Sequence, residues 1–144
     1  MNETQKLIAK AAITIDAPAA KVWEALVKPE IIKQYLFGTD VTTDWKVGSP
    51  IKYTGVWQGK TYEDKGKVVQ FVPGKLIVST YWSSMGGLPD TPENYKTVRY
   101  ELSSQGGQTQ LTITQDNNAS EEDARHSEQN WQMVLEGIKK LLEG

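Results

Sequence analysis

Residues 13–26 read ITIDAPAAKVWEAL, and they carry two periodicities in succession. Apolar side chains alternate with polar ones up to Asp16, which predicts a strand that is buried on one face. From Ala19 onward the apolar residues recur at spacings of three and four, and Asp16 and Pro18 stand where a capping carboxylate and a first-turn proline are common. The sequence therefore predicts a strand that is followed directly by a short amphipathic helix.

The chain continues with a second short helix and then with strands. Pro29 begins a helical pattern that stops near Gly38. Alternating segments separated by turn residues predict further strands at 51–57, 61–72, 75–82, 95–102 and 108–115. Residues 83–94 hold two glycines and two prolines, which predicts a mobile loop.

A long helix is predicted at the C-terminus. Ser120 stands at the cap position, acidic residues fill the first turn, and an apolar stripe continues to Glu143. Gly137 lies inside this helix, on its flank, where we expect it to be tolerated. The expected order is a strand, two short helices, six strands, five of which have the ranges given above, and one long helix.

The composition excludes several classes of function. With 16 Lys and Arg against 18 Asp and Glu, the net charge of −2 is too weak and of the wrong sign to hold a nucleic-acid backbone. There is no cysteine and only one histidine, which excludes disulfides, thiol nucleophiles and zinc sites built from Cys and His. No apolar run approaches the roughly 18 residues of a membrane span, and the N-terminus lacks a secretory signal. We therefore expect one cytoplasmic domain over residues 1–144, without cofactor or metal.

Four motifs in this order resemble one protein superfamily. They are residues 13–26, the run Asp44-Trp45-Lys46-Val47-Gly48-Ser49, residues 66–76 and residues 131–143. The chain resembles the START-like superfamily, also called SRPBCC or helix-grip proteins, in the branch related to the C-terminal domain of the heat-shock-protein-90 ATPase activator. This resemblance implies an α+β helix-grip fold, in which a curved antiparallel sheet of about seven strands grips the long C-terminal helix on its concave face. It also implies a cavity between sheet and helix, which in related families holds sterols, lipids, hormones, polyketides or aromatic compounds.

The residues favour such a cavity near the start of the C-terminal helix. The second half of this helix presents large apolar side chains to the sheet, while its first turns present only Ala124 and Ser127. Aromatic rings that converge on the concave face leave space that the helix cannot fill. We expect the cavity near Ser127 and Trp131, with Met85 and Leu88 of the 83–94 loop as a lid. The predicted ligand-binding residues are Tyr53, Trp57, Trp82, Met85, Tyr100, Ser127, Trp131 and Val134. The alternative is that each of these aromatic rings simply fills the core.

The sequence offers few catalytic groups. His126 falls among charged residues in the second turn of the long helix, which favours a solvated histidine over a general base. Glu63 and Asp64 are adjacent, so on a strand they face opposite sides, and we expect both to be surface charges. The acidic residues 121–123 are typical of a helix start and do not indicate a metal site. We therefore predict no catalytic residue and no metal ligand.

Three functions fit these observations. The first is binding of a small lipophilic or aromatic molecule, as a carrier or a sensor. The second, implied by the resemblance, is a protein-interaction module that stimulates a chaperone ATPase. The third is an enzyme similar to polyketide cyclases and aromatases, which requires a buried acid or base in the cavity. We favour the first, because the expected polar groups are hydroxyls and indole N–H groups, which suit hydrogen bonding better than proton transfer. The expected partners are a small hydrophobic ligand or a chaperone, not nucleic acid, and the chain is expected to be a monomer or a weak homodimer.

Overall fold

Strand β1 (Ala9–Ile15) leads into helix α1 (Ala19–Val27) and the short helix α2 (Pro29–Tyr35), as residues 13–26 predict. The computed structural model describes residues 7–36, 38–83, 87–118 and 120–143, and for Trp57 it describes the backbone only. The prediction that Asp16 caps α1 is wrong, since the N-cap is Pro18 and its carbonyl accepts hydrogen bonds from the Lys21 and Val22 amides. The backbone of Pro18 is extended, so the helix begins one residue after the proline.

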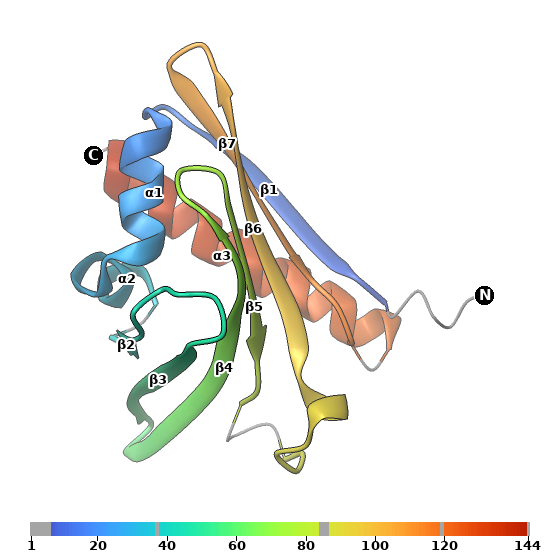
Figure 1. Cartoon of the computed structure of the whole chain (residues 1–144). Coiled ribbons are helices and arrows are strands. Elements are labelled where there is room, and N and C mark those ends of the chain that lie inside the picture. The colour runs from blue at the N-terminus through green and yellow to red at the C-terminus, as the bar shows by residue number, and fades with distance from the viewer. Residues whose placement is uncertain (1–6, 37, 84–86, 119, 144) are drawn as a thin grey trace.

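Seven antiparallel strands form the sheet in the order β1-β7-β6-β5-β4-β3-β2 (Figure 1). The strands after the two short helices are β2 (Asp40–Thr42), β3 (Pro50–Trp57), β4 (Lys60–Val72), β5 (Leu76–Tyr81), β6 (Lys96–Gln105) and β7 (Gln108–Gln115). The α+β class, the strand number and the helix order are confirmed. No strand is predicted at β2, because three residues are too few to show an alternation.

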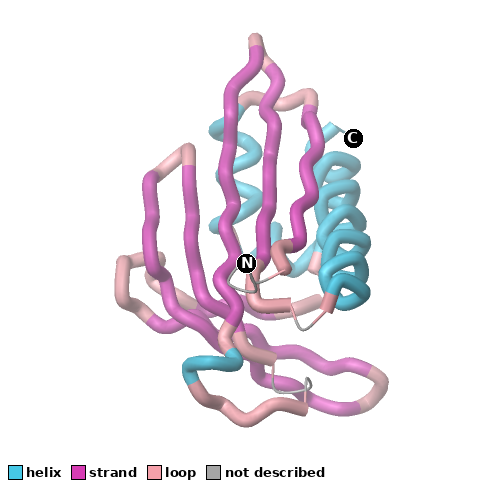
Figure 2. The backbone as a smooth tube through the Cα atoms, turned by 90° about the vertical axis from the view of Figure 1, so that its right-hand side faces the viewer, coloured by secondary structure: helices cyan, strands magenta, loops and turns pink. Residues whose placement is uncertain are grey.

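Helix α3 (Glu121–Glu143) lies across the sheet and closes the fold (Figure 1). The Ser120 hydroxyl accepts a hydrogen bond from the Asp123 amide at 3.1 Å, so the predicted cap is present. Leu135 and Ile138 are fully buried and belong to one core cluster with residues of β1, α1, β6 and β7. Figure 2, a view turned by 90°, shows the helix running alongside the strands. In the described ranges, no helix combines the length and the apolar character needed to cross a membrane.

The sheet bends sharply at Gly66. Strand β4 pairs with β3 up to Lys67 and with β5 from Val68, and the register shifts between Val68 and Gln70. A Cβ atom on Gly66 would lie 1.7 Å from the carbonyl oxygen of Thr80, so only glycine allows this approach of two backbones. The lower part of β4 and the whole of β3 bend away from β5 and β6 (Figure 1). Gly66 therefore permits the curvature on which the concave face depends.

We predict opposite effects of two glycine-to-alanine substitutions. Gly66→Ala lowers the free energy of unfolding by about 3 kcal/mol, because the new methyl group overlaps backbone atoms that cannot rotate away. In α3, Gly137→Ala raises it by up to about 1 kcal/mol through helix propensity, since its Cβ would meet only the Tyr35 Cβ, at 3.6 Å. Urea denaturation of both variants measures the two changes. A Gly66→Ala variant as stable as the wild type would show that the bend does not need glycine.

Candidate functional site

A cavity of about 450 Å³ lies between the middle of α3 and the sheet. This volume is within the range of small-molecule sites. The wall draws on β3 to β7, on α3 and on the segment after α2. The lining residues are Leu36, Thr39, Tyr53, Tyr62, Asp64, Tyr81, Val98, Tyr100, Gln115, Ser127, Asn130, Trp131 and Val134.

The space exists because α3 changes character along its length. Toward the C-terminus Leu135 and Ile138 are fully buried in the core. Toward the N-terminus the helix presents Ser127 and Trp131 to the cavity, and the rings of Trp131 and Tyr100 pack edge to face with centroids 5.8 Å apart. The small Ser127 side chain contacts Gln115 of β7 but fills little of the space that a large apolar side chain would fill, so the cavity opens beside it.

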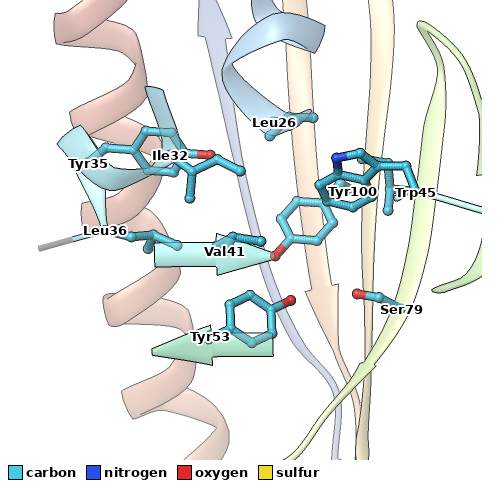
Figure 3. A pocket seen from close by; sticks show the side chains of 10 residues that line it. Leu26, Ile32, Tyr35, Leu36, Val41, Trp45, Tyr53, Ser79 and Tyr100 are labelled. Carbon is cyan, nitrogen blue, oxygen red and sulfur yellow. The ribbon is translucent and has the colours of Figure 1, made fainter. Parts of the chain in front are cut away.

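A second, smaller chamber of about 30 Å³ adjoins the cavity. Figure 3 shows the side chains that line this chamber. Its wall combines aliphatic and aromatic side chains, with Ile32 and Val41 on one side, and it shares Leu36, Tyr53 and Tyr100 with the larger cavity. At about 10–15 Å³ per water molecule, it is large enough for about two waters or for a small substituent of a ligand. In Figure 3 the hydroxyls of Tyr53, Tyr100 and Ser79 converge at this chamber. These two tyrosines therefore stand between the two spaces.

The tyrosine hydroxyls around the cavity differ in whether the protein satisfies them. Tyr53 hydrogen-bonds to the buried Ser79 hydroxyl, and Tyr62 shares a hydrogen bond of 2.5 Å with the Thr39 hydroxyl. The Tyr100 hydroxyl, in contrast, has no hydrogen bond within the part of the chain that the structure describes. Tyr100 therefore offers the cavity a donor and an acceptor.

Burial keeps these phenols protonated. It raises the pKa of Tyr53 to about 12, and the pKa of Tyr100 rises well above its usual value, mainly by burial and then through Tyr53 and Tyr35. The pKa of Tyr81 is raised by burial first and by its hydrogen bond to Asp64 second. At neutral pH all three are neutral groups that can donate a hydrogen bond.

The end of the cavity near the start of α3 is closed by a polar network. The Trp131 indole N–H donates to the Gln115 side-chain oxygen at 2.8 Å. The Ser127 hydroxyl donates to the Asn118 side-chain oxygen at 2.9 Å, and the Gln115 amide donates to Ser127 at 3.3 Å. Trp131 and Ser127 therefore line the cavity while their polar groups hold the helix to β7.

Asp64 corrects the expectation that it is a surface charge. Its residue exposure is only 7%, it lines the cavity, and its carboxylate accepts a hydrogen bond from the Tyr81 hydroxyl at 2.6 Å. The opposite orientations of Glu63 and Asp64 are as predicted, and Glu63 is exposed. The error arose because Tyr81, which receives the inward carboxylate, lies on another strand and cannot be paired with Asp64 from local sequence. The cavity thus contains the buried acid that the sequence analysis did not find.

The structure brings together five of the eight residues predicted to bind a ligand. These five cavity-lining residues are Tyr53, Tyr100, Ser127, Trp131 and Val134. Trp82 lies outside the lining, where its indole N–H donates to the carbonyls of Leu88 and Pro89 and its ring stacks on Tyr95. Met85 and the Trp57 side chain lie outside the described parts of the chain.

Other lining residues were not predicted from the sequence, of which Tyr62, Asp64 and Tyr81 matter most. The signal for the first two was their alternation on β4, which places both on one face. His126 is exposed, as predicted. Among the described residues, no group of three or more His, Cys, Asp or Glu side chains could hold a metal ion.

Comparison with known proteins places this geometry in a family. The model of the family described as "Activator of Hsp90 ATPase homolog 1-like protein" matches residues 16–143. None of the curated proteins matches the chain.

Among solved structures, the chain is similar to protein ChR145 from Cytophaga hutchinsonii, with 49% identity, a TM-score of 0.86 and coverage of 99% of this chain and 97% of that one. The Aha1 dimer from Colwellia psychrerythraea has the same fold, with 22% identity, a TM-score of 0.72 and coverage of 94% and 96%. DynU16, a protein in the dynemicin biosynthetic locus, shares the fold at 17% identity and a TM-score of 0.78, and the match covers 95% of this chain and 47% of that one. The chain is therefore a member of the Activator of Hsp90 ATPase homolog 1-like family, within the START-like superfamily.

Proposed function

We propose that the chain binds a small lipophilic or aromatic molecule between α3 and the sheet, as a carrier or a sensor. The observation that carries this proposal is the cavity of about 450 Å³, whose wall combines aromatic and aliphatic side chains with a few polar groups. Burial of apolar ligand surface against such a wall contributes roughly 25 cal/mol per Å². This contribution supplies affinity without specifying one ligand.

The polar groups on the wall supply orientation. Tyr53, Trp131 and Ser127 use their polar atoms within the protein, so their contribution to a ligand is mainly surface contact. The hydroxyl of Tyr100 has no such partner among the described residues, and it lies at the junction of the cavity and the inner chamber. A ligand oxygen or nitrogen at this point would satisfy the hydroxyl and fix the direction in which the ligand lies.

A pair of tryptophan substitutions on adjacent residues of α3 tests whether the cavity is the binding site. Val134 lines the cavity, whereas Met133 is 54% exposed on the outer face of the helix. We expect Val134→Trp to fill the cavity and weaken ligand binding by at least about tenfold, since the ligand must compete with the indole for the space. Met133→Trp should leave the affinity unchanged. Proton–nitrogen correlation spectra titrated with sterols, fatty acids, flavonoids and polyketide-like aromatics measure the binding.

The folded state of both variants is checked in the same spectra. Equal affinity of Val134→Trp and the wild type for every compound that binds would place the binding site elsewhere. Absence of saturable shifts with the whole panel would contradict small-molecule binding itself.

Removing single hydroxyl groups tests the role of Tyr100. Tyr100→Phe deletes a hydroxyl that lacks a described partner, so we expect unchanged or slightly higher stability and a loss of ligand affinity of about 3- to 10-fold. The control is Tyr35→Phe, which removes the hydrogen bond from the hydroxyl to the Ala25 carbonyl at 2.6 Å. This control should lower the free energy of unfolding by about 1 kcal/mol. Urea denaturation and ligand titration of both variants measure the two effects, and a clear loss of stability in Tyr100→Phe would assign its hydroxyl to the fold.

Family membership favours a second candidate, a module that stimulates a chaperone ATPase. The family is described by the activation of the Hsp90 ATPase, and the Aha1 dimer is a structural neighbour over almost the whole chain. This function would use the outer surface of the protein and would not need the cavity.

The ATPase rate of heat-shock protein 90 in the presence of the chain tests this second candidate. If the module is active, the rate rises with added protein, and Val134→Trp stimulates as strongly as the wild type because its new side chain lies inside. No association at micromolar concentrations would remove the candidate. Loss of stimulation in Val134→Trp would instead link the two functions.

A further inference from the structure

Asp64 lies in an aromatic corner of the cavity. Its direct partner across the β3–β4 ladder is Tyr53, and its carboxylate accepts the hydrogen bond from Tyr81. The rings of Tyr53 and Tyr81 pack edge to face, with centroids 5.5 Å apart. Tyr62, two residues before Asp64 on the same strand, lines the cavity as well. The carboxylate is thus placed among the faces and edges of several phenol rings.

The charge on this wall is one-sided. Asp64 is the only Asp or Glu among the described residues that line the cavity, and no Lys, Arg or His lines it. The next residue, Lys65, is exposed on the other face of β4, and its ammonium group meets the Asp90 carboxylate at 2.5 Å. The cavity therefore presents a negative group to any ligand that enters.

Two physical effects, charge-assisted hydrogen bonding and the attraction of cations to aromatic rings, both favour a positively charged ligand. Hydrogen bonds between a carboxylate and a charged donor are roughly twice as strong as neutral ones, and they gain in a site that excludes water. A carboxylate has about four acceptor positions, so a ligand can bind it beside the groups that already contact it, of which the Tyr81 hydroxyl is one. Aromatic rings attract cations over their faces, and the wall contains Tyr53, Tyr62, Tyr81, Tyr100 and Trp131.

We propose that the ligand is a lipophilic amine, whose ammonium group is bound by Asp64 while its apolar body lies between the aromatic wall and α3. This inference rests on the proposed function and names the class of ligand. A carboxylic acid of the same shape would be repelled by Asp64, and a neutral alcohol would gain only the weaker hydrogen bond.

Three probes that share one ring system test the proposal: naphthylethylamine, naphthylethanol and naphthylacetate at neutral pH. We expect the amine to bind to the wild type at least about tenfold more tightly than the alcohol, and the acid to bind most weakly. Asp64→Asn should remove at least about tenfold of the amine affinity and leave the alcohol within about threefold of its wild-type value. The matched control is Glu63→Gln, which removes one negative charge from the adjacent residue, whose carboxylate is exposed. It should leave the order of the three probes unchanged.

The outcomes separate this inference from the proposed function. An alcohol that binds the wild type as tightly as the amine, or an amine affinity that Asp64→Asn leaves intact, overturns the amine assignment while small-molecule binding stands. Binding of neutral compounds alone overturns it in the same way. If neither these probes nor the wider panel binds, both proposals fail. The ranking of the three probes on the wild-type chain decides the question even if Asp64→Asn does not fold.

Discussion

The arrangement of this protein depends on how α3 packs against the sheet. Leu135 and Ile138 fill the space between helix and strands completely, and they fix the C-terminal half of the helix in the core. At Ser127 the same helix face carries a small side chain that leaves space unfilled, and the polar network through Gln115 and Asn118 holds this part of the helix in place. One end is held by apolar packing and the other by hydrogen bonds, so the space between them does not collapse. The cavity follows from this unequal filling of one helix face.

Much of the fold could be predicted because its signals are local. The strand and helix of residues 13–26, the Ser120 cap and the long apolar stripe of α3 each depend on neighbours in the chain, and the structure contains all of them. Features that depend on distant backbone could not be predicted. Strand β2 exists because β3 pairs with it, and the demand for glycine at Gly66 comes from the Thr80 carbonyl on another strand.

The residues of the candidate site also differ in whether local sequence could predict them. Ser127 and Trp131 could be placed near a cavity because helical periodicity shows which face of α3 they share and how little the first turns fill it. Asp64 could not, because a charged residue on a strand is most often solvated and its buried partner Tyr81 is far away in sequence. Trp82 is the opposite case. It was predicted to line the cavity because it is an aromatic residue on an expected strand, but its ring lies outside the lining and stacks on Tyr95. Alternation identifies a face, but the twist and the end of a strand decide what that face meets.

The bend at Gly66 has a consequence for how such a binding site can diversify. It separates the part of the wall that carries Tyr53, Tyr62 and Asp64 from the part carried by the strands beyond it. The width of the cavity is therefore set by the angle between the two halves of the sheet. Gly66, where this angle is made, does not itself line the cavity. Proteins that descend from one ancestral chain could keep the same lining side chains and still bind ligands of different width by altering this angle. In protein engineering, the bend could likewise be changed to alter the size of the ligand, and the lining residues could be changed separately to alter its chemistry.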